Sequence, residues 1–306
     1  MEAFSASHHG TYFFIVFELA QCTLWDFLKG GSQVEYPSQE LWTQIHGLAS
    51  GLAYLHGQKV KGGKQKNGTL YHQDLKPSNI LIINKVMKIA DFGLSDYKPY
   101  PRMSDSNLVG DSKHEGAKVY APPSRAGPLS DKYDIYSLGT ILSEIASYDV
   151  GKETQVERYR ENRRKDGKES EGSMQFYDPT TFELKPSVRV EHSNILEAAE
   201  KSKDFDLEAT LDRRWQKNFY QKSLFDLIAQ MLHVKESIRP SATEVVTKLK
   251  SRIHEASRAL RGSEPYNIDI WDSTVKGTVP VNAEAPDKAM DCRLYVFLLY
   301  FYFGLF

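Results

Sequence analysis

A polar loop followed at once by two apolar runs constrains this chain more than any other stretch. The loop carries Asp74, Lys76 and Asn79, and the apolar runs between residues 80 and 90 are separated only by the dipeptide Asn-Lys. Two such runs around a short polar dipeptide predict a tight β-hairpin. Asp91 follows directly, so the hairpin would return it to the same side of one cleft as Asn79.

The segments Tyr71–Leu81, with the sequence YHQDLKPSNIL, and Asp91–Gly93, with the sequence DFG, resemble two signature loops of the protein kinase family. The first resembles its catalytic loop and the second its magnesium-binding loop. DFG alone arises often by chance, but the two signatures in this order are specific. The resemblance implies transfer of the γ-phosphate of ATP to Ser or Thr of a protein substrate, because a lysine follows the loop aspartate by two residues, as in Ser/Thr kinases.

The resemblance also implies a role for each residue of the site. Asp74 would accept or orient the proton of the substrate hydroxyl, and Lys76 would face the transferring phosphate. Asn79 and Asp91 would hold Mg²⁺, an ion that prefers oxygen ligands. The predicted catalytic residues are therefore Asp74, Lys76 and Asn79, whereas Asp91 belongs to both the metal site and the nucleotide site. His72 has no Cys or His at ligand spacing, which favours a packed structural role.

The apolar run Phe13–Ala20 resembles the last strand of the kinase small lobe and the hinge that holds adenine. The resemblance implies that the carbonyl of Glu18 and the amide of Ala20 contact the nucleotide, with Phe17 at the back of the pocket. A buried strand in any fold would show the same run, so this signal is weak without the two loops.

Helix signals follow the hinge in the order that the family requires. Thr23 can cap a short helix over residues 23–28, and Ser38 can cap a long amphipathic helix. Asp134 would brace the backbone of the catalytic loop, and Arg239 lies in a turn that resembles the Arg-Pro turn before the last kinase helices. Two apolar helical faces are expected: Leu41, Ile45, Leu48, Ala49, Leu52 and Leu55 in the first, and Phe225, Ile228, Ala229, Met231 and Leu232 in the second. The resemblance covers roughly residues 11–255.

Three positions depart from the family pattern. Gln73 replaces the arginine that pairs with a phosphorylated activation segment, so phosphorylation of the serines within 104–112 is a less obvious switch. Ala117 replaces a threonine that bridges the catalytic Asp and Lys. Ser124 replaces the glutamate that pairs with the residue matching Arg239, so Arg239 is expected to be either solvated or paired elsewhere.

The pattern of a complete small lobe is absent from this sequence. Residues 1–11 are too few for the expected strands and helix, and they contain neither a lysine nor Gly-x-Gly-x-x-Gly. The predicted fold class is therefore α+β, a protein-kinase-like fold that is mainly the helical large lobe with one residual small-lobe strand and hinge. The predicted domains are that remnant at residues 1–20, the large lobe at 21–255, and a linker with an apolar tail at 256–306.

Two insertions in the large lobe are expected, near residues 57–68 and 151–204. The first is rich in Gly and Lys and is predicted to be exposed. The second begins with a stretch of mixed charge, 151–172, which indicates a mixed-charge helix or a solvated insertion on a surface suited to a docking partner. The apolar tail 294–306 is shorter than the roughly 20 residues that span a bilayer, so it favours either a membrane-surface anchor or the product of a misread exon boundary.

Composition limits the partners and the cellular compartment that we expect. A net charge of −1 provides no field for nucleic acid, and two cysteines make no disulfide framework. Without a signal peptide before the fold, we expect an intracellular, cytoplasmic protein. Three functions stay open: an active Ser/Thr kinase whose small lobe lies outside this sequence, a pseudokinase or large-lobe scaffold that binds protein partners without catalysis, and a truncated product with no function of its own. Retention of the metal ligands favours the first, because a scaffold has no need of them.

Overall fold

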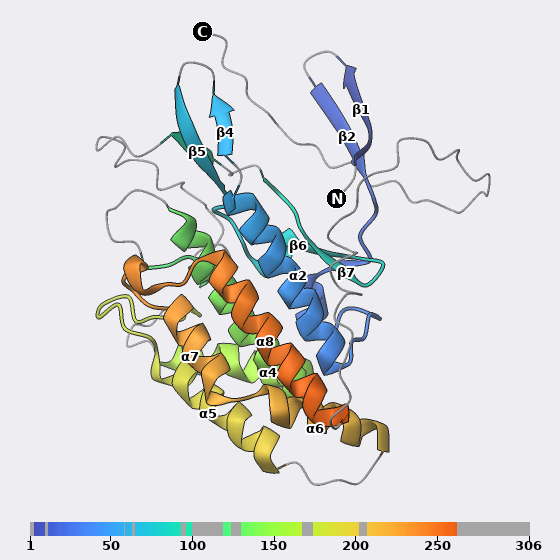
Figure 1. The fold of residues 1–306 in the computed structure, drawn as a ribbon, viewed down its shortest axis with the longest axis vertical. Helices are drawn as coiled ribbons and strands as arrows, with labels where there is room; N and C mark the ends of the chain where they lie inside the picture. The colour runs from blue at the N-terminus through green and yellow to red at the C-terminus, as the bar shows by residue number, and fades with distance from the viewer. Residues whose placement is uncertain are drawn as a thin grey trace, which may run out of the picture. The chain divides into compact units, whose positions relative to one another are not determined.

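The computed structural model describes residues 3–9, 12–57, 59–62, 65–92, 96–99, 119–123, 130–166, 174–201 and 207–261. Its contacts divide the chain into two units, one of Met1–Leu19 with Arg258–Phe306 and one of Ala20–Ser257. The second unit holds both signature loops and most of the helices (Figure 1).

The first unit contains a two-stranded antiparallel hairpin rather than the single strand that the sequence predicted. Strand β1, Ala3–His9, pairs with β2, Tyr12–Phe17, with His9 opposite Tyr12 and Ala3 opposite Phe17. The apolar run in β2 marks it as a strand, whereas β1 has no such run. β1 forms because the backbone N–H and C=O groups of a strand need partners, a requirement that side-chain patterning does not show.

The second unit begins with a small sheet that confirms the predicted hairpin. Its strands, β3 (Cys22–Thr23), β6 (Ile80–Ile83) and β7 (Val86–Ile89), are antiparallel and lie in the order β3-β6-β7. Asn84 and Lys85 form the turn with φ of 50° and 61°, the left-handed values that a tight hairpin turn requires.

Thr23 also caps helix α1, Leu24–Leu28, as predicted. Its hydroxyl accepts from Asp26 N at 3.1 Å, while the Asp26 carboxylate accepts from the Thr23 backbone N–H at 3.1 Å. This reciprocal pair is a capping box, which satisfies two backbone donors at the start of a helix.

The stretch 57–68 contains a strand and the start of a second strand. Strand β4, Lys59–Gly62, pairs with β5, Gln65–Tyr71, and β5 pairs in turn with β8, Asp96–Pro99. Its Gly-rich and Lys-rich composition gave no sign of strands. Antiparallel pairing depends on backbone hydrogen bonds instead. The second partner of β5, strand β8, lies farther along the chain, after Asp91.

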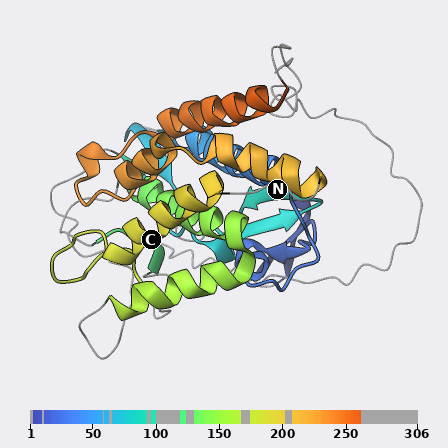
Figure 2. The same cartoon turned by 90° about the horizontal axis from the view of Figure 1, so that it is seen from below.

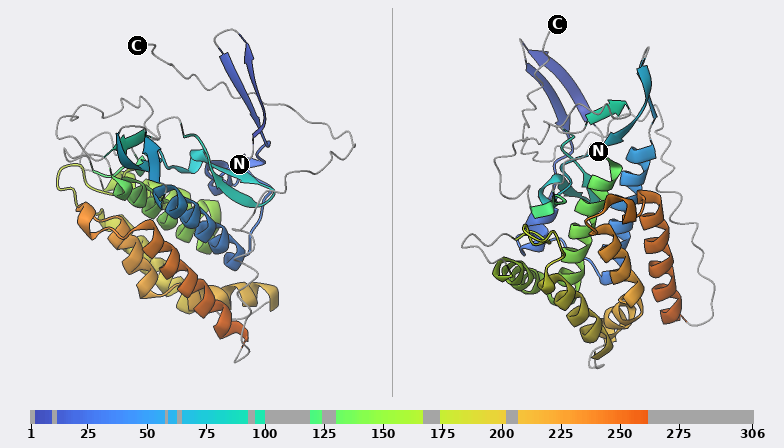
Figure 3. Two further views of the ribbon diagram at one scale, coloured as in Figure 1. Left: turned by 45° about the horizontal axis from the view of Figure 1, so that its top comes forward. Right: turned by 90° about the vertical axis from the view of Figure 1, so that its left-hand side faces the viewer.

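Helix α4 contacts more helices of the second unit than any other described helix does. Helices α2 (Ser38–Gly57), α5 (Pro186–Lys201), α6 (Leu207–Phe219), α7 (Lys222–Met231) and α8 (Ala242–Arg261) accompany α4 (Asp131–Lys165) and two short 3₁₀ turns, η1 (Pro77–Asn79) and η2 (Glu236–Ile238). Helix α4 contacts α1, α2, α5 and α7, and Figures 2 and 3 show α2, α4 and α5 to α7 side by side. Every residue from Asp134 to Ser147 is buried, so this half of α4 is a core helix.

Two of the predicted apolar faces are largely confirmed. Most of the named residues of α2 are buried, and only Leu55 is half-buried. In α7, Ala229 is exposed, contrary to the prediction, and Leu224 and Leu227 are buried instead. The buried stripe of α7 is therefore wider towards its N-terminal end than the sequence analysis assigned.

The described part of the mixed-charge stretch is helical as far as Lys165 and is buried along one face. Helix α4 is interrupted at Gly151 and Lys152, which leave helical geometry, and it then continues to Lys165. In this second half, Val156, Tyr159, Arg160 and Arg163 are buried. For these described residues, the mixed-charge helix is the alternative that the structure supports, and a solvated insertion is not.

Ser38 does not cap α2 as predicted, because it is the first residue of the helix and its hydroxyl contacts the carboxylates of Asp149 and Asp212. Ser38 Oγ lies 2.7 Å from Asp149 Oδ1 and 2.9 Å from Asp212 Oδ2. One hydroxyl hydrogen cannot serve both acceptors. Burial raises the pKa of Asp149, so a protonated Asp149 can supply the second hydrogen.

We expect Asp149→Asn to flatten the dependence of folding stability on pH. Because the folded pKa of Asp149 is raised above its ordinary value of 3.8, its contribution is fully present below that value and is lost as pH rises through the folded pKa. Asparagine can still accept from Trp42 and Tyr220, which donate to Asp149 Oδ2 at 3.2 and 2.7 Å, and can donate to Ser38.

Chemical unfolding at about pH 4 and about pH 7 would measure the effect. Asp149→Ala is the matched control. It leaves Trp42 and Tyr220 without this acceptor and should lower the free energy of unfolding at both pH values. An Asn variant as destabilised at pH 7 as the Ala variant would contradict the prediction.

Candidate active site

The structure brings the three predicted catalytic residues into direct contact. Lys76 Nζ lies 2.6 Å from Asp74 Oδ2, and Asn79 Nδ2 donates to both the backbone oxygen and Oδ2 of Asp74 at 2.9 Å. The 3₁₀ turn η1 begins at Pro77 and turns the chain so that Asn79 faces back towards Asp74. The side chains of Asp74 and Lys76 remain 14% and 20% exposed, so both can be reached from solvent.

Asp134 braces the backbone of the catalytic loop, as predicted. Its side chain is fully buried at the start of α4, where Oδ2 accepts from His72 N and Oδ1 accepts from Gln73 N, each at 2.8 Å. His56, in the last turn of α2, reaches the same carboxylate at 2.9 Å through Nε2. Gln73 has a φ of 67°, a strained value for a residue with a long side chain, and the two bonds to Asp134 help to hold it.

His72 is a packed structural residue, in agreement with the sequence analysis. Its buried ring lies between the two signature loops, with Nε2 at 3.0 Å from the carbonyl oxygen of Ala90 and Nδ1 accepting from Asp74 N at 3.3 Å. An accepting Nδ1 carries no hydrogen, so the ring hydrogen is on Nε2 and is donated to Ala90. The imidazole therefore connects the catalytic loop to Ala90, the residue that precedes Asp91.

Asp91 lies at the end of the hairpin that begins at Asn79. Ala90 N donates to the carbonyl oxygen of Asn79 at 2.9 Å, so the backbones on either side of the hairpin are joined next to both predicted metal ligands. Asp91 has a φ of 63°, and the ring of Phe92 contacts that of His72 at 5.0 Å between centroids. Gly93 lies outside the described residues.

The donor set suits a magnesium ion that is shared with phosphate groups. The amide nitrogen of Asn79 bonds to Asp74, so its Oδ1 is the atom that can ligate a metal beside the Asp91 carboxylate. In the described part of the chain, no three Cys, His, Asp or Glu side chains gather as a metal site. Sites with only one or two carboxylates are typical for Mg²⁺, which takes its other ligands from water and substrate phosphates.

The two predicted adenine contacts lie on either side of the boundary between the units. Glu18 and Ala20 are half-buried and Leu19 is exposed. The backbone N–H of Gln21 donates to Ile82 O at 2.8 Å, which joins the chain after the hinge to strand β6. Contact of Glu18 and Ala20 with a nucleotide stays a prediction.

Arg239 is paired elsewhere, which is one of the two outcomes that the sequence left open. Its guanidinium is buried and donates to the carbonyl oxygens of His233, Lys132 and Val234 at 2.8, 3.0 and 3.3 Å. Ala117, Ser124 and the serines within 104–112 lie outside the described residues.

Sequence reasoning missed several residues that support the site. His56 carries no signal beyond being a histidine in the last turn of a long helix. Glu144, Arg160 and Arg163 form a buried ion-pair cluster whose only trace in the sequence is two arginines three residues apart in a charged stretch. The burial of that cluster depends on contacts between distant segments.

Comparison with known proteins gives the family. A model of the protein kinase domain matches residues 1–249. The chain belongs to the protein kinase family. This match supports the predicted α+β fold with a helical large lobe, and members of the family use ATP and a divalent metal ion and act on protein substrates. Relatives named as serine/threonine-protein kinases support the Ser/Thr-kinase assignment.

Curated kinases from animals and plants resemble parts of this chain. Receptor-interacting serine/threonine-protein kinase 2 of Bos taurus is 36% identical over 38% of this chain and 21% of its own length. The LRR receptor-like kinase ERECTA of Arabidopsis thaliana is 30% identical over 47% of this chain and 14% of its own length. Cyclin-dependent kinase F-3 of Oryza sativa subsp. japonica is 29% identical over 43% and 27%. The matched region therefore spans about a quarter or less of these relatives.

Among the helices that the structure describes, none combines the length and apolar character needed to cross a bilayer. The apolar tail 294–306 lies outside the described residues.

We expect Asp134→Asn to lower the free energy of unfolding by about 1 to 3 kcal/mol, because the amide group would replace one of two buried acceptors and leave a loop N–H unpaired. Asp226→Asn is the matched control, since the exposed Asp226 pairs with the exposed Lys222 within α7. Urea unfolding of both variants measures the difference. Equal stability of the two variants would show that Asp134 is not the brace of the loop.

Proposed function

We propose that this chain carries the catalytic lobe of a Ser/Thr protein kinase, which transfers the γ-phosphate of ATP to a Ser or Thr hydroxyl of a protein. The observation that supports this most is the contact of Asp74 with both Lys76 and Asn79. A scaffold has no physical need for a carboxylate, an ammonium and an amide that converge in this way.

Each side chain has a task in this proposal. Asp74 Oδ2 accepts or orients the proton of the attacking hydroxyl, while Lys76 Nζ, 2.6 Å away, offsets the negative charge of the transferring phosphate. Asn79 fixes the orientation of the Asp74 carboxylate through its amide nitrogen. Positioning of this kind is the main contribution of a protein to phosphoryl transfer, since the reacting groups need little covalent help.

Magnesium is the proposed metal, held by Asn79 Oδ1 and the Asp91 carboxylate. When bound, it would neutralise charge on the phosphates. The carbonyl of Glu18 and the amide of Ala20 are the proposed contacts of adenine.

A protein substrate and a docking partner on the large lobe are further parts of the proposal. We also propose an intracellular, cytoplasmic setting, in which ATP is available. A reducing compartment suits Cys22, a free half-buried thiol whose sulfur donates to Ser32 Oγ at 3.1 Å.

A second candidate function is a pseudokinase that binds protein partners without catalysis. Residues 1–17 of this sequence contain no lysine and no glycine-rich phosphate loop, so this sequence alone is consistent with either candidate. A lysine and a glycine-rich loop are both parts of the nucleotide site in active kinases.

Nucleotide binding can be tested on the chain as it stands. We expect the 306-residue chain to bind ATP with Mg²⁺ weakly or not at all, because the groups that hold the α- and β-phosphates are absent from its sequence. Isothermal titration calorimetry measures this directly. An affinity in the low micromolar range would contradict the expectation and would show that other residues hold the phosphates.

In a form of the protein that includes a small lobe, we expect phosphate transfer to Ser or Thr and its loss in Asp74→Asn. Removing a general base typically costs about 10² to 10⁴ in rate. Phosphopeptide analysis and the turnover rate are the measurements, with Asp226→Asn, on the exposed face of α7, as the control. Undiminished transfer by a folded Asp74→Asn protein would overturn the proposed mechanism.

A further inference from the structure

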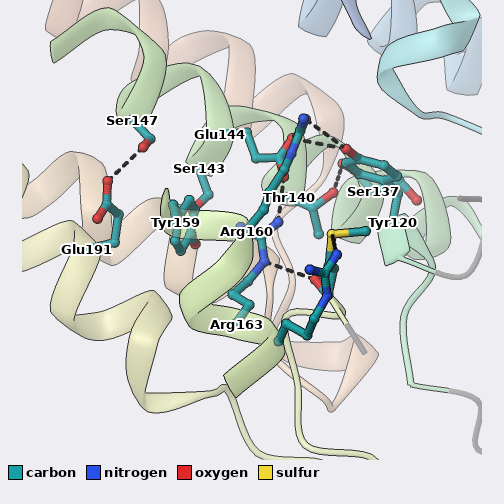
Figure 4. A network of polar contacts seen from close by, with 12 residues as sticks. Tyr120, Ser137, Thr140, Ser143, Glu144, Ser147, Tyr159, Arg160, Arg163 and Glu191 are labelled. Atoms are coloured by element: carbon teal, nitrogen blue, oxygen red, sulfur yellow. Dashed lines mark hydrogen bonds and ion pairs between the residues drawn. The ribbon is translucent and has the colours of Figure 1, made fainter. Parts of the chain in front are cut away.

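Helix α4 holds a second segment besides the catalytic loop. Ten residues after Asp134, Glu144 Oε2 accepts a hydrogen bond from the hydroxyl of Tyr120 at 3.0 Å (Figure 4). Tyr120 and Val119 are buried, and they belong to the described segment 119–123, within the stretch that resembles the end of a kinase activation segment. One rigid core helix therefore positions both the catalytic loop and this segment.

Glu144 is fully buried, and an isolated carboxylate in that position would be protonated. Two arginines in the second half of α4 keep the Glu144 carboxylate ionised. Arg160 Nη2 and Nε donate to Oε2 and Oε1 at 2.6 and 3.0 Å, and Arg163 Nη2 donates to Oε1 at 2.5 Å. Burial acts to raise the pKa of Glu144, but the two guanidinium groups outweigh it and lower the pKa to about 2.

Both arginines are themselves fixed by aromatic rings. The Arg163 guanidinium lies 4.2 Å from the ring centre of Tyr159 and 3.9 Å from that of Phe176, and its Nε donates to the carbonyl oxygen of Met174 at 2.9 Å. The Arg160 guanidinium lies 4.3 Å from the ring centre of Trp25 in α1. Such contacts stabilise a cation that is removed from water.

The interruption in α4 makes this cluster geometrically feasible. Arg160 follows Glu144 by 16 residues, which in a straight helix would separate them by about 24 Å along the axis. At Gly151 the chain leaves helical geometry, and a Cβ there would come within 2.6 Å of the Cβ of Gln155. Glycine is therefore required at the point where the second half of α4 turns back towards the first (Figure 2).

We infer that residues 153–165 are a built-in positioning element: Arg160 and Arg163 keep Glu144 ionised inside the core, and Glu144 in turn holds Tyr120 and the segment 119–123. The insertion is thus part of the machinery that shapes the activation-segment end, rather than an appended surface helix. Its effect on substrate binding rests on the proposed kinase function, whereas its effect on the segment 119–123 does not.

Hydrogen exchange followed by mass spectrometry tests the inference independently of activity. In the double variant Arg160→Gln with Arg163→Gln, Glu144 loses both charged partners, so its carboxylate must either stay ionised without compensation or take up a proton. Exchange of the amides of Val119, Tyr120 and Ala121, the residues of 119–123 that are not proline, should then rise by about tenfold or more. The matched control is Arg158→Gln with Arg164→Gln, which changes two exposed arginines of the same helical segment. Equal exchange at 119–123 in the two double variants would overturn the inference.

Adding Glu144→Gln to the double variant distinguishes charge compensation from simple packing. The triple variant has no buried charge to compensate, so exchange at 119–123 should fall back towards the wild-type rate. If the double variant does not fold, a folded triple variant supports the inference in the same way. A triple variant that exchanges as fast as the double variant, or that also fails to fold, would show that the arginines act only as packing groups.

Enzyme kinetics test the effect of this element on substrate binding. In an active form of the protein, the double variant should raise KM for the protein substrate at least about fivefold while leaving KM for ATP near its wild-type value. A lower kcat with an unchanged KM for the protein substrate would refute this effect. If no form of the protein transfers phosphate, the proposed function fails, but the exchange experiment still decides the role of the insertion.

Discussion

The buried carboxylate of Asp134 is the interaction on which the rest of the structure depends. It accepts hydrogen bonds from the backbone N–H groups of His72 and Gln73 and lies within hydrogen-bond distance of the His56 ring. It therefore joins α2, α4 and the catalytic loop at one point. A loop with a strained backbone, such as that at Gln73, keeps one conformation only when its surroundings determine it more than once. The loop that carries Asp74 is held from α2 and α4 by these bonds.

The same helix illustrates how a polar core can be stable when each group is paired. Ser143 Oγ lies 2.7 Å from the hydroxyl of Tyr159 and 2.8 Å from His192 Nε2, and Ser147 donates to Glu191 at 2.7 Å (Figure 4). Burial lowers the pKa of His192 to about 3, so its ring is neutral in this network. Paired polar groups specify one arrangement of neighbouring helices more strictly than apolar contacts do, because a shift of one turn would leave them unsatisfied.

Features that depend on neighbours in the sequence were predictable. The turn at Asn84 and Lys85 and the cap at Thr23 are local patterns, and the loop around Asp74 has a specific residue order. Features that depend on distant partners were not. Ser38 looks like a cap in its own segment, but its hydroxyl meets the carboxylates of Asp149 and Asp212, which lie more than 100 residues away. The pairing of β5 with β8 and the buried face of the charged helix likewise depend on segments that are distant in the sequence.

The ring of His72 has a mechanical consequence for the two signature loops. It receives the N–H of Asp74 on one side and donates to the carbonyl of Ala90 on the other, and both bonds require the same placement of one ring hydrogen. If either loop moved alone, the imidazole would lose a bond in a place that water does not reach. The proposed base, Asp74, and the proposed metal ligand, Asp91, are therefore held in fixed relation to each other by a side chain that has no proposed role in the chemistry.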